Sequence, residues 1–130
     1  MTDPKDWPKN RELWTTALRD PERKRIRGVL GHQNRGGQCC LGVLAEIAGC
    51  THTVGTVGTV GTVGVEAALW DGEGADAPRR AMNFVGLRRS NGEYFSGDRS
   101  LAYDNDTDMN FREIADIIEE EPEGLFREAV

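Results

Sequence analysis

The sequence predicts an α+β fold in which three to four short helices pack on a small antiparallel sheet. Apolar residues recur at helical spacing near the two ends of the chain, over residues 10–19 and 111–118. Between them, residues 24–30 alternate as a strand does, and residues 90–93 form a turn typical of hairpins. A chain of 130 residues is long enough for one modest core, so we expect a single domain over residues 1–130.

The first expected helix covers residues 10–19. Pro8 suits its first turn, and Asp20-Pro21 ends it. Its apolar face comprises Leu13, Trp14, Ala17 and Leu18. In the strand that follows, over residues 24–30, alternate side chains point to opposite faces.

A turn over residues 32–37 precedes a second, mostly buried helix over residues 39–48, with Gly49 suited to its end. Thr-Val-Gly then occurs four times over residues 53–64. A period of three matches neither a helix nor a strand, and glycine weakens both. We interpret the repeat as an insertion that forms an expanded loop or irregular hairpin. The alternative is a strand edge that pairs with another subunit, because Val and Thr favour strands.

The second half has weaker signals until its last helix. Residues 65–70 fit a strand or a helix, and Ala77-Pro78 opens a short helix that ends at Gly86. Residues 101–106 are expected to lead into a loop. The last helix begins with a capping box, Asn110 to Glu113, and buries Phe111, Ile114, Ala115 and Ile118. It ends in three glutamates, which oppose the helix dipole and need a basic partner or full solvation.

The charge is unevenly distributed along the chain, whose net charge is −6. Residues 1–64 carry nine Lys and Arg against six Asp and Glu, whereas residues 65–130 carry seven against sixteen. A basic half and an acidic half can meet between subunits, so a homo-oligomer is expected. An acidic chain is a poor general nucleic-acid binder. The sequence shows no apolar run for a membrane span or a secretory signal, which predicts a cytoplasmic protein with free thiols.

The order of several short motifs resembles a family of small uncharacterised proteins encoded by phages and their bacterial hosts. The motifs are Glu12-Leu13-Trp14-x-x-Ala17-Leu18-Arg19, Gly28-Val29-Leu30, Cys39-Cys40-Leu41-Gly42-Val43-Leu44, Asn105-Asp106 and Phe111-x-x-Ile114-Ala115-Asp116-x-Ile118. The chain departs from the pattern at Gln38, which replaces an aromatic residue, at Tyr103-Asp104, which replaces a leucine, and in the repeat. The resemblance implies a phage accessory protein and no particular reaction.

An anion site is the first candidate for function. Arg25 and Arg27 share one face of the expected strand, and Arg35 lies in the turn before the cysteines. Guanidinium groups suit phosphate recognition, and the amides of Gly36 and Gly37 at a helix start favour an anion. The alternative is that these arginines pair with the acidic residues of the second half.

Further ligand contacts are expected from aromatic and Asx residues. Trp70 and Tyr103 are possible stacking platforms, although Trp70 is more typical of a core or an interface. Asn105 can contact a base edge and Asp106 a ribose hydroxyl. The alternative for both is that they hydrogen-bond their own backbone and hold a turn.

Cys40 is the candidate for catalysis, because a helix N-terminus lowers the pKa of a thiol. His32 is its candidate base. The alternative is that Cys39 and Cys40 pack as small apolar residues beneath Trp14. The three cysteines lack the paired spacing of a structural zinc site, and neither a metal nor a cofactor is expected.

Three functions follow from these candidates. We favour a non-enzymatic, phage-encoded protein that sequesters a small nucleotide immune signal of the cyclic or ADP-ribose type. The first alternative is an acidic effector whose surface over residues 104–123 binds a basic host protein. The second alternative is a cysteine hydrolase that uses Cys40 and His32.

Overall fold

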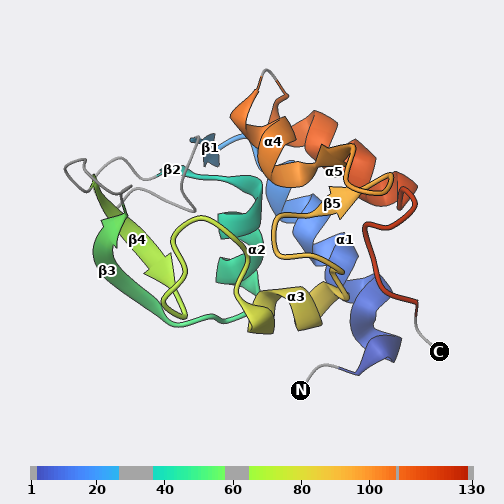
Figure 1. The fold of residues 1–130 in the computed structure, drawn as a ribbon, viewed down its shortest axis with the longest axis horizontal. Helices are drawn as coiled ribbons and strands as arrows, with labels where there is room; N and C mark the ends of the chain where they lie inside the picture. Colours follow the sequence, from blue (N-terminus) through green and yellow to red (C-terminus); the bar gives the residue numbers. More distant parts are fainter. Residues whose placement is uncertain (1–2, 27–36, 58–64, 108, 129–130) are drawn as a thin grey trace.

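Helix α2 (Cys40–Ile47) lies at the centre of the molecule, between the other helices and a long hairpin (Figure 1). The structure is a computed structural model that describes residues 3–26, 37–57, 65–107 and 109–128. The other helices are η1 (Pro4–Asp6, a 3₁₀ helix), α1 (Trp7–Leu18), α3 (Arg79–Val85), α4 (Leu101–Asp106) and α5 (Phe111–Glu120). The strands are β1 (Lys24–Arg25), β2 (Gly37–Gln38), β3 (His52–Val57), β4 (Val65–Trp70), β5 (Glu93–Tyr94) and β6 (Arg99–Ser100).

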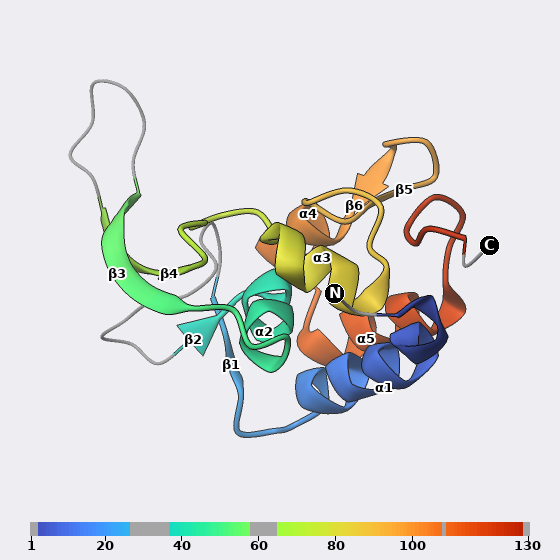
Figure 2. The ribbon, with the colours of Figure 1, turned by 90° about the horizontal axis from the view of Figure 1, so that it is seen from below.

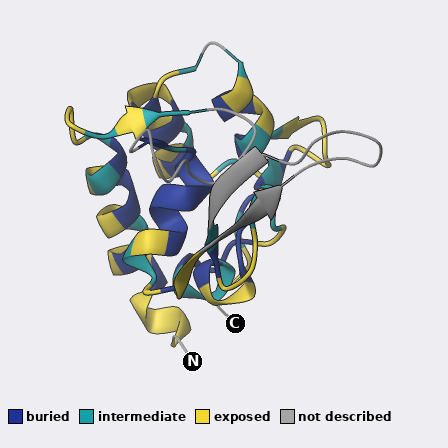
Figure 3. Cartoon of the chain, turned by 90° about the vertical axis from the view of Figure 1, so that its left-hand side faces the viewer, coloured by how far each residue is buried: buried dark blue, intermediate teal, exposed yellow. Residues whose placement is uncertain are grey.

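The expected α+β class is confirmed, but the β structure differs from the expected single sheet. Within the described residues, the six strands form three two-stranded sheets, and the β1–β2 pair is parallel. The helices therefore supply most of the core. Figure 3 shows the buried residues gathered where the helices face one another.

The core forms where α1 and α5 lie side by side and α2 packs against α1 (Figure 2). Trp14 of α1 is fully buried, and α5 buries the four apolar residues that its spacing predicts. In α2, the six residues from Cys40 to Ala45 are all buried. This helix therefore has no solvent-exposed stripe, in agreement with its continuous apolar sequence.

Helix α1 begins at Trp7, three residues earlier than expected, and its buried face matches the predicted one at Trp14 and Leu18 but not at Leu13. Leu13 is 47% exposed, whereas the polar residues Asn10 and Thr15 are buried. The reason is a set of hydrogen bonds to the C-terminal end of α3. Trp7 Nε1 donates to Asn83 O (2.9 Å), Asn10 Nδ2 to Phe84 O (2.7 Å) and Arg11 Nε to Val85 O (2.8 Å). These side chains satisfy carbonyl groups that a helix end leaves without partners.

The hairpin β3–β4 extends away from the helices (Figures 1 and 2). Its strands pair in register from His52↔Trp70 to Val57↔Val65, so residues 65–70 form a strand and not a helix. The first repeat residues, 53–57, belong to this regular ladder, and residues 58–64 lie outside the described part. The expectation of a hairpin is thus confirmed.

The structure differs from the sequence-based prediction at β2, β5–β6 and α4. Gly37 was expected in an exposed turn, but it is buried in β2, where a Cβ atom would lie 2.3 Å from Ile26 Cγ2. The turn predicted near residues 90–93 is present, but the turn of the β5–β6 hairpin lies at residues 95–98. Residues 101–106 form α4 instead of leading into a loop, because Ser100 Oγ caps the helix by accepting from Tyr103 N at 3.1 Å.

The capping box of α5 is present, as predicted. Its acidic C-terminal end meets basic partners from α1. Arg11 Nη1 donates to Glu121 Oε1 at 2.5 Å, and Arg19 contacts Glu119 and Asp116. Of the two predicted alternatives, basic partners or full solvation, Glu119 and Glu121 have basic partners, and Glu120 is exposed.

Candidate functional site

Asn105 is a buried joint between three segments, not a ligand contact. Its side chain is inaccessible to solvent. Oδ1 accepts from Cys40 N at 3.0 Å, and Nδ2 donates to Ile26 O at 2.7 Å. The side chain therefore joins α4 to the start of α2 and to the residue after β1. Both ends of the amide are engaged within the protein and the side chain is fully buried, so it is not accessible to a base edge.

Arg25 approaches the same joint from β1. Its Nη1 donates to the carbonyl oxygens of Asn105 and Thr107, the latter at 3.1 Å. A cation at this position also complements the negative end of α4. The remaining guanidinium nitrogens, Nε and Nη2, donate to no acceptor in the described part of the chain.

The start of α2 does not offer an open anion seat in the described residues. Cys40 N donates to Asn105 Oδ1, and Gly42 N contacts Cys39 Sγ at 3.4 Å. Gly37 is buried in β2. The chain's own acceptors thus take two of the amides at the start of α2. Arg27, His32, Arg35 and Gly36 lie outside the described residues.

The two adjacent cysteines pack in the core. Cys40 is fully buried, and Trp14 Nε1 donates to its carbonyl oxygen at 3.1 Å. Burial raises the pKa of Cys39 to about 12 and the pKa of Cys40 well above its ordinary value. A neutral, buried thiol is a poor nucleophile. The packing interpretation is therefore confirmed.

The other predicted contacts are dispersed. Trp70 is buried at the base of the β3–β4 hairpin, where its ring centroid lies 5.1 Å from that of His52. Tyr103 is 66% exposed on α4, and Asp106 is exposed at the end of the same helix. Of the predicted site residues, the structure brings together Arg25, Gly37, Cys40 and Asn105, and it does so by internal bonds.

A groove that the sequence did not reveal lies beside Arg25. Its volume is about 390 Å³, and it forms where the end of α1, the segment leading to β1 and the start of α5 meet. Its lining is Leu18, Arg19, Asp20, Pro21, Arg23, Arg25, Asn110, Phe111 and Arg112. We call it the arginine groove, because four guanidinium groups and a single carboxylate line it. Only Arg25 of these arginines was singled out from the sequence.

The four arginines differ in how their charge is balanced. Arg19 contacts Asp116 and Glu119, and these hydrogen bonds raise its pKa. Arg23 Nη1 donates to Glu46 Oε2 at 2.6 Å, while its buried Nε has no hydrogen-bond partner. Arg25 and Arg112 form no ion pair with any described carboxylate. Neither of these two charges is thus neutralised by a carboxylate within the described part of the chain.

The start of α5 adds to the positive character of the groove. Asn110 Oδ1 accepts from Glu113 N at 2.9 Å, so the capping box satisfies one amide of the first turn. The amides of Phe111 and Arg112 have no acceptor among the described residues. Free amides at a helix N-terminus favour an anion.

The described residues hold neither a cluster of metal ligands nor a membrane-spanning helix. They contain no group of three or more His, Cys, Asp or Glu side chains that could hold a metal ion. None of the described helices is both long and apolar enough to cross a membrane.

Comparison with known proteins gives one match. A family model described as a domain of unknown function, DUF8296, matches residues 8–122. No curated protein and no solved structure matches the chain. The matched region includes α1 to α5, the Asn105 joint and the whole arginine groove. The chain therefore belongs to the DUF8296 family.

Proposed function

We propose that this protein is a non-enzymatic binding protein that sequesters a small anionic nucleotide in the arginine groove. The observation that carries the proposal is that Arg25 and Arg112 have no carboxylate partner among the described residues, in a groove whose described lining holds one carboxylate. Guanidinium groups bind phosphate, as they bind carboxylate, with two parallel hydrogen bonds, which suits them to the phosphate groups of a nucleotide.

The size and lining of the groove suit a nucleotide. Its volume of about 390 Å³ falls in the range of small-molecule sites, about 300–1,000 Å³. Leu18, Pro21 and Phe111 supply apolar surface beside the arginines. The phosphate groups would lie against Arg25, Arg112 and the first amides of α5, with the base on the apolar surface.

The chemistry of the lining supports binding more than catalysis. Asp20 is the single carboxylate, and its Oδ1 accepts from Glu22 N at 3.0 Å. The remaining polar side chains of the lining are guanidinium groups and the capping amide of Asn110. General acid–base catalysis requires a group that exchanges protons near neutral pH, and guanidinium does not.

The finer proposal rests on the resemblance to phage-encoded proteins. In the cytoplasm of an infected bacterium, the protein would act as a sponge for a cyclic or ADP-ribose-type nucleotide and so blunt an immune signal. A homo-oligomer would present several grooves at once and raise the capacity of the sponge.

The alternative of an acidic effector has less support. Asp116, Glu119 and Glu121, which belong to the acidic region, already pair with Arg11 and Arg19. Capture of a host protein through residues 104–123 in a low-salt pull-down would favour this alternative over nucleotide binding.

Calorimetry with a panel of cyclic mononucleotides, cyclic dinucleotides and ADP-ribose tests the proposal. We expect micromolar or tighter binding of at least one of them, weakened by added salt. Arg112→Gln should reduce the affinity about tenfold, the effect of losing about 1.4 kcal/mol of charge-assisted hydrogen bonding. Arg79→Gln is the matched control, because Arg79 is exposed on α3 and does not line the groove. A flat response to the whole panel, or equal losses in both variants, would remove the proposal.

A further inference from the structure

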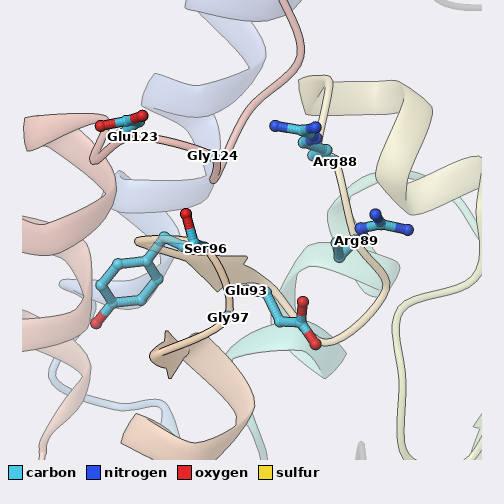
Figure 4. A pocket seen from close by; sticks show the side chains of 8 residues that line it. Arg88, Arg89, Glu93, Ser96, Gly97, Glu123 and Gly124 are labelled. Carbon is cyan, nitrogen blue, oxygen red and sulfur yellow. The ribbon is translucent and has the colours of Figure 1, made fainter.

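A second hollow lies where two neighbouring segments of the chain meet a third segment that follows α5. Arg88 and Arg89 follow α3, Glu93 to Gly97 form β5 and the adjoining turn, and Glu123 and Gly124 follow α5 (Figure 4). The volume of the hollow is about 260 Å³. It shares no lining residue with the arginine groove.

Backbone hydrogen bonds fix the walls of this hollow. Arg88 N donates to Leu125 O at 3.0 Å, and Phe95 N donates to Glu123 O at 2.8 Å. Arg127 N donates to Gly86 O at 2.7 Å just outside. The segment after α5 is thus joined both to the segment after α3 and to the β5–β6 turn. The side chains of the hollow are therefore carried on positioned backbone and not on a loose loop.

Charges of both signs line the hollow without pairing with one another. In the described part of the chain, neither Arg88 nor Arg89 forms an ion pair with Glu93 or Glu123, although all four line the same space. Figure 4 shows Arg88 and Glu123 on opposite sides, with the hydroxyl of Ser96 directed into the space between them. Opposite charges held apart across a small hollow would be matched by a ligand that carries one charge of each sign.

The backbone of the β5–β6 turn is strained where it orients Ser96. Phe95 and Ser96 have φ angles of 54° and 58°, a left-handed conformation that costs residues with a Cβ about 1–2 kcal/mol each. The bond from Phe95 N to Glu123 O helps to hold it. The backbone of Ser96 is therefore held between the two charged sides.

We propose that this hollow binds a small zwitterion of the free α-amino acid class, with Arg88 on its carboxylate, Glu123 on its ammonium group and Ser96 between them. A simple anion would meet two glutamates, and a simple cation would meet two arginines, so neither matches the whole lining. The volume is also smaller than that of the arginine groove and suits a molecule of amino-acid size. The site stands independently of the nucleotide proposal, because it is built from other residues.

Titration of the isotope-labelled full chain by NMR tests the site. The probes are free amino acids, a carboxylic acid without the amine, an alkylamine without the carboxylate, and inorganic phosphate. We expect a saturable shift of the amide signals of Ser96, Gly97 and Gly124 with one or more amino acids. The single-charge analogues should bind about tenfold or more weakly, because each lacks one charge-assisted contact.

Two variants test the contacts to the carboxylate and to the ammonium group of the ligand separately. Arg88→Gln and Glu123→Gln should each weaken amino-acid binding about tenfold, whereas Arg79→Gln, outside the hollow, should leave it unchanged. Unchanged amide spectra elsewhere in the variants show that the fold is kept. No saturable shift with any amino acid, or equal affinity for the carboxylic acid or phosphate alone, would overturn the zwitterion assignment. Nucleotide binding by Arg88→Gln at the arginine groove is unaffected in either case, so the two proposals fail separately.

Discussion

Replacement of Asn105 by alanine provides the sharpest test of the structure. The change removes the acceptor of Cys40 N and the donor to Ile26 O. The amide of Cys40 is then left buried without a partner, which costs about 1–3 kcal/mol, and loss of the second hydrogen bond costs about 1 kcal/mol more. We therefore expect Asn105→Ala to lower the free energy of unfolding by about 2–4 kcal/mol.

Urea unfolding followed by circular dichroism measures this difference, and Asn110→Ala provides the comparison. Asn110 is exposed and caps α5 with one hydrogen bond to Glu113 N, so its loss should cost about 1 kcal/mol. The midpoint should shift with little change in the slope m, because the surface exposed on unfolding stays nearly the same. If Asn105→Ala costs no more than Asn110→Ala, Asn105 is not the buried joint that the structure shows.

Three further predictions concern the core. The thiols of Cys39 and Cys40 should resist iodoacetamide in the native protein and react only in denaturant, because both are buried and their pKa is raised. Mass spectrometry measures the labelling, and rapid labelling of the native protein would contradict the prediction. Trp14→Ala should cost about 3–5 kcal/mol in the same urea assay, and a loss below about 1 kcal/mol would show that the site collapses or is not packed. Burial and the hydrogen bond to Asp104 raise the pKa of Tyr94, so its contribution to stability is complete below the ordinary tyrosine pKa of about 10 and falls as the pH rises above it. Tyr94→Phe should reduce the loss of stability at alkaline pH, and identical alkaline profiles would refute the assignment.

Local signals explain the elements that the sequence predicted well. The capping box of α5 and its apolar spacing lie within the helix itself, and the structure reproduces both. Helix α4 is not predicted from the sequence, because only Ser100 and Leu101 provide a local signal for a helix. Its other support is tertiary: Tyr94 Oη donates to Asp104 Oδ2 at 2.5 Å, and Arg99 Nη2 donates to Asp104 Oδ1 at 3.1 Å.

The role of the candidate site residues is harder to predict from the sequence, because it depends on partners that are far away along the chain. The sequence singled out Arg25, Cys40 and Asn105, and these residues do meet, although Asn105 lies 65 positions after Cys40. The residue types and their spacing identify these three residues as candidates, but they do not show that the residues are joined by hydrogen bonds within the protein. The arginine groove was overlooked for the same reason, since Arg19 and Arg112 come together only when the start of α5 packs beside the end of α1.

The hydrogen bonds from α1 to the end of α3 bear on the order of folding. Helix α3 has seven residues, fewer than the roughly 12–15 that an isolated helix needs in water. Its last carbonyl groups find donors 74 to 76 positions earlier in the chain. During synthesis α1 leaves the ribosome first but has nothing to cap until α3 follows, so the two helices should gain protection from hydrogen exchange together, as one cooperative unit.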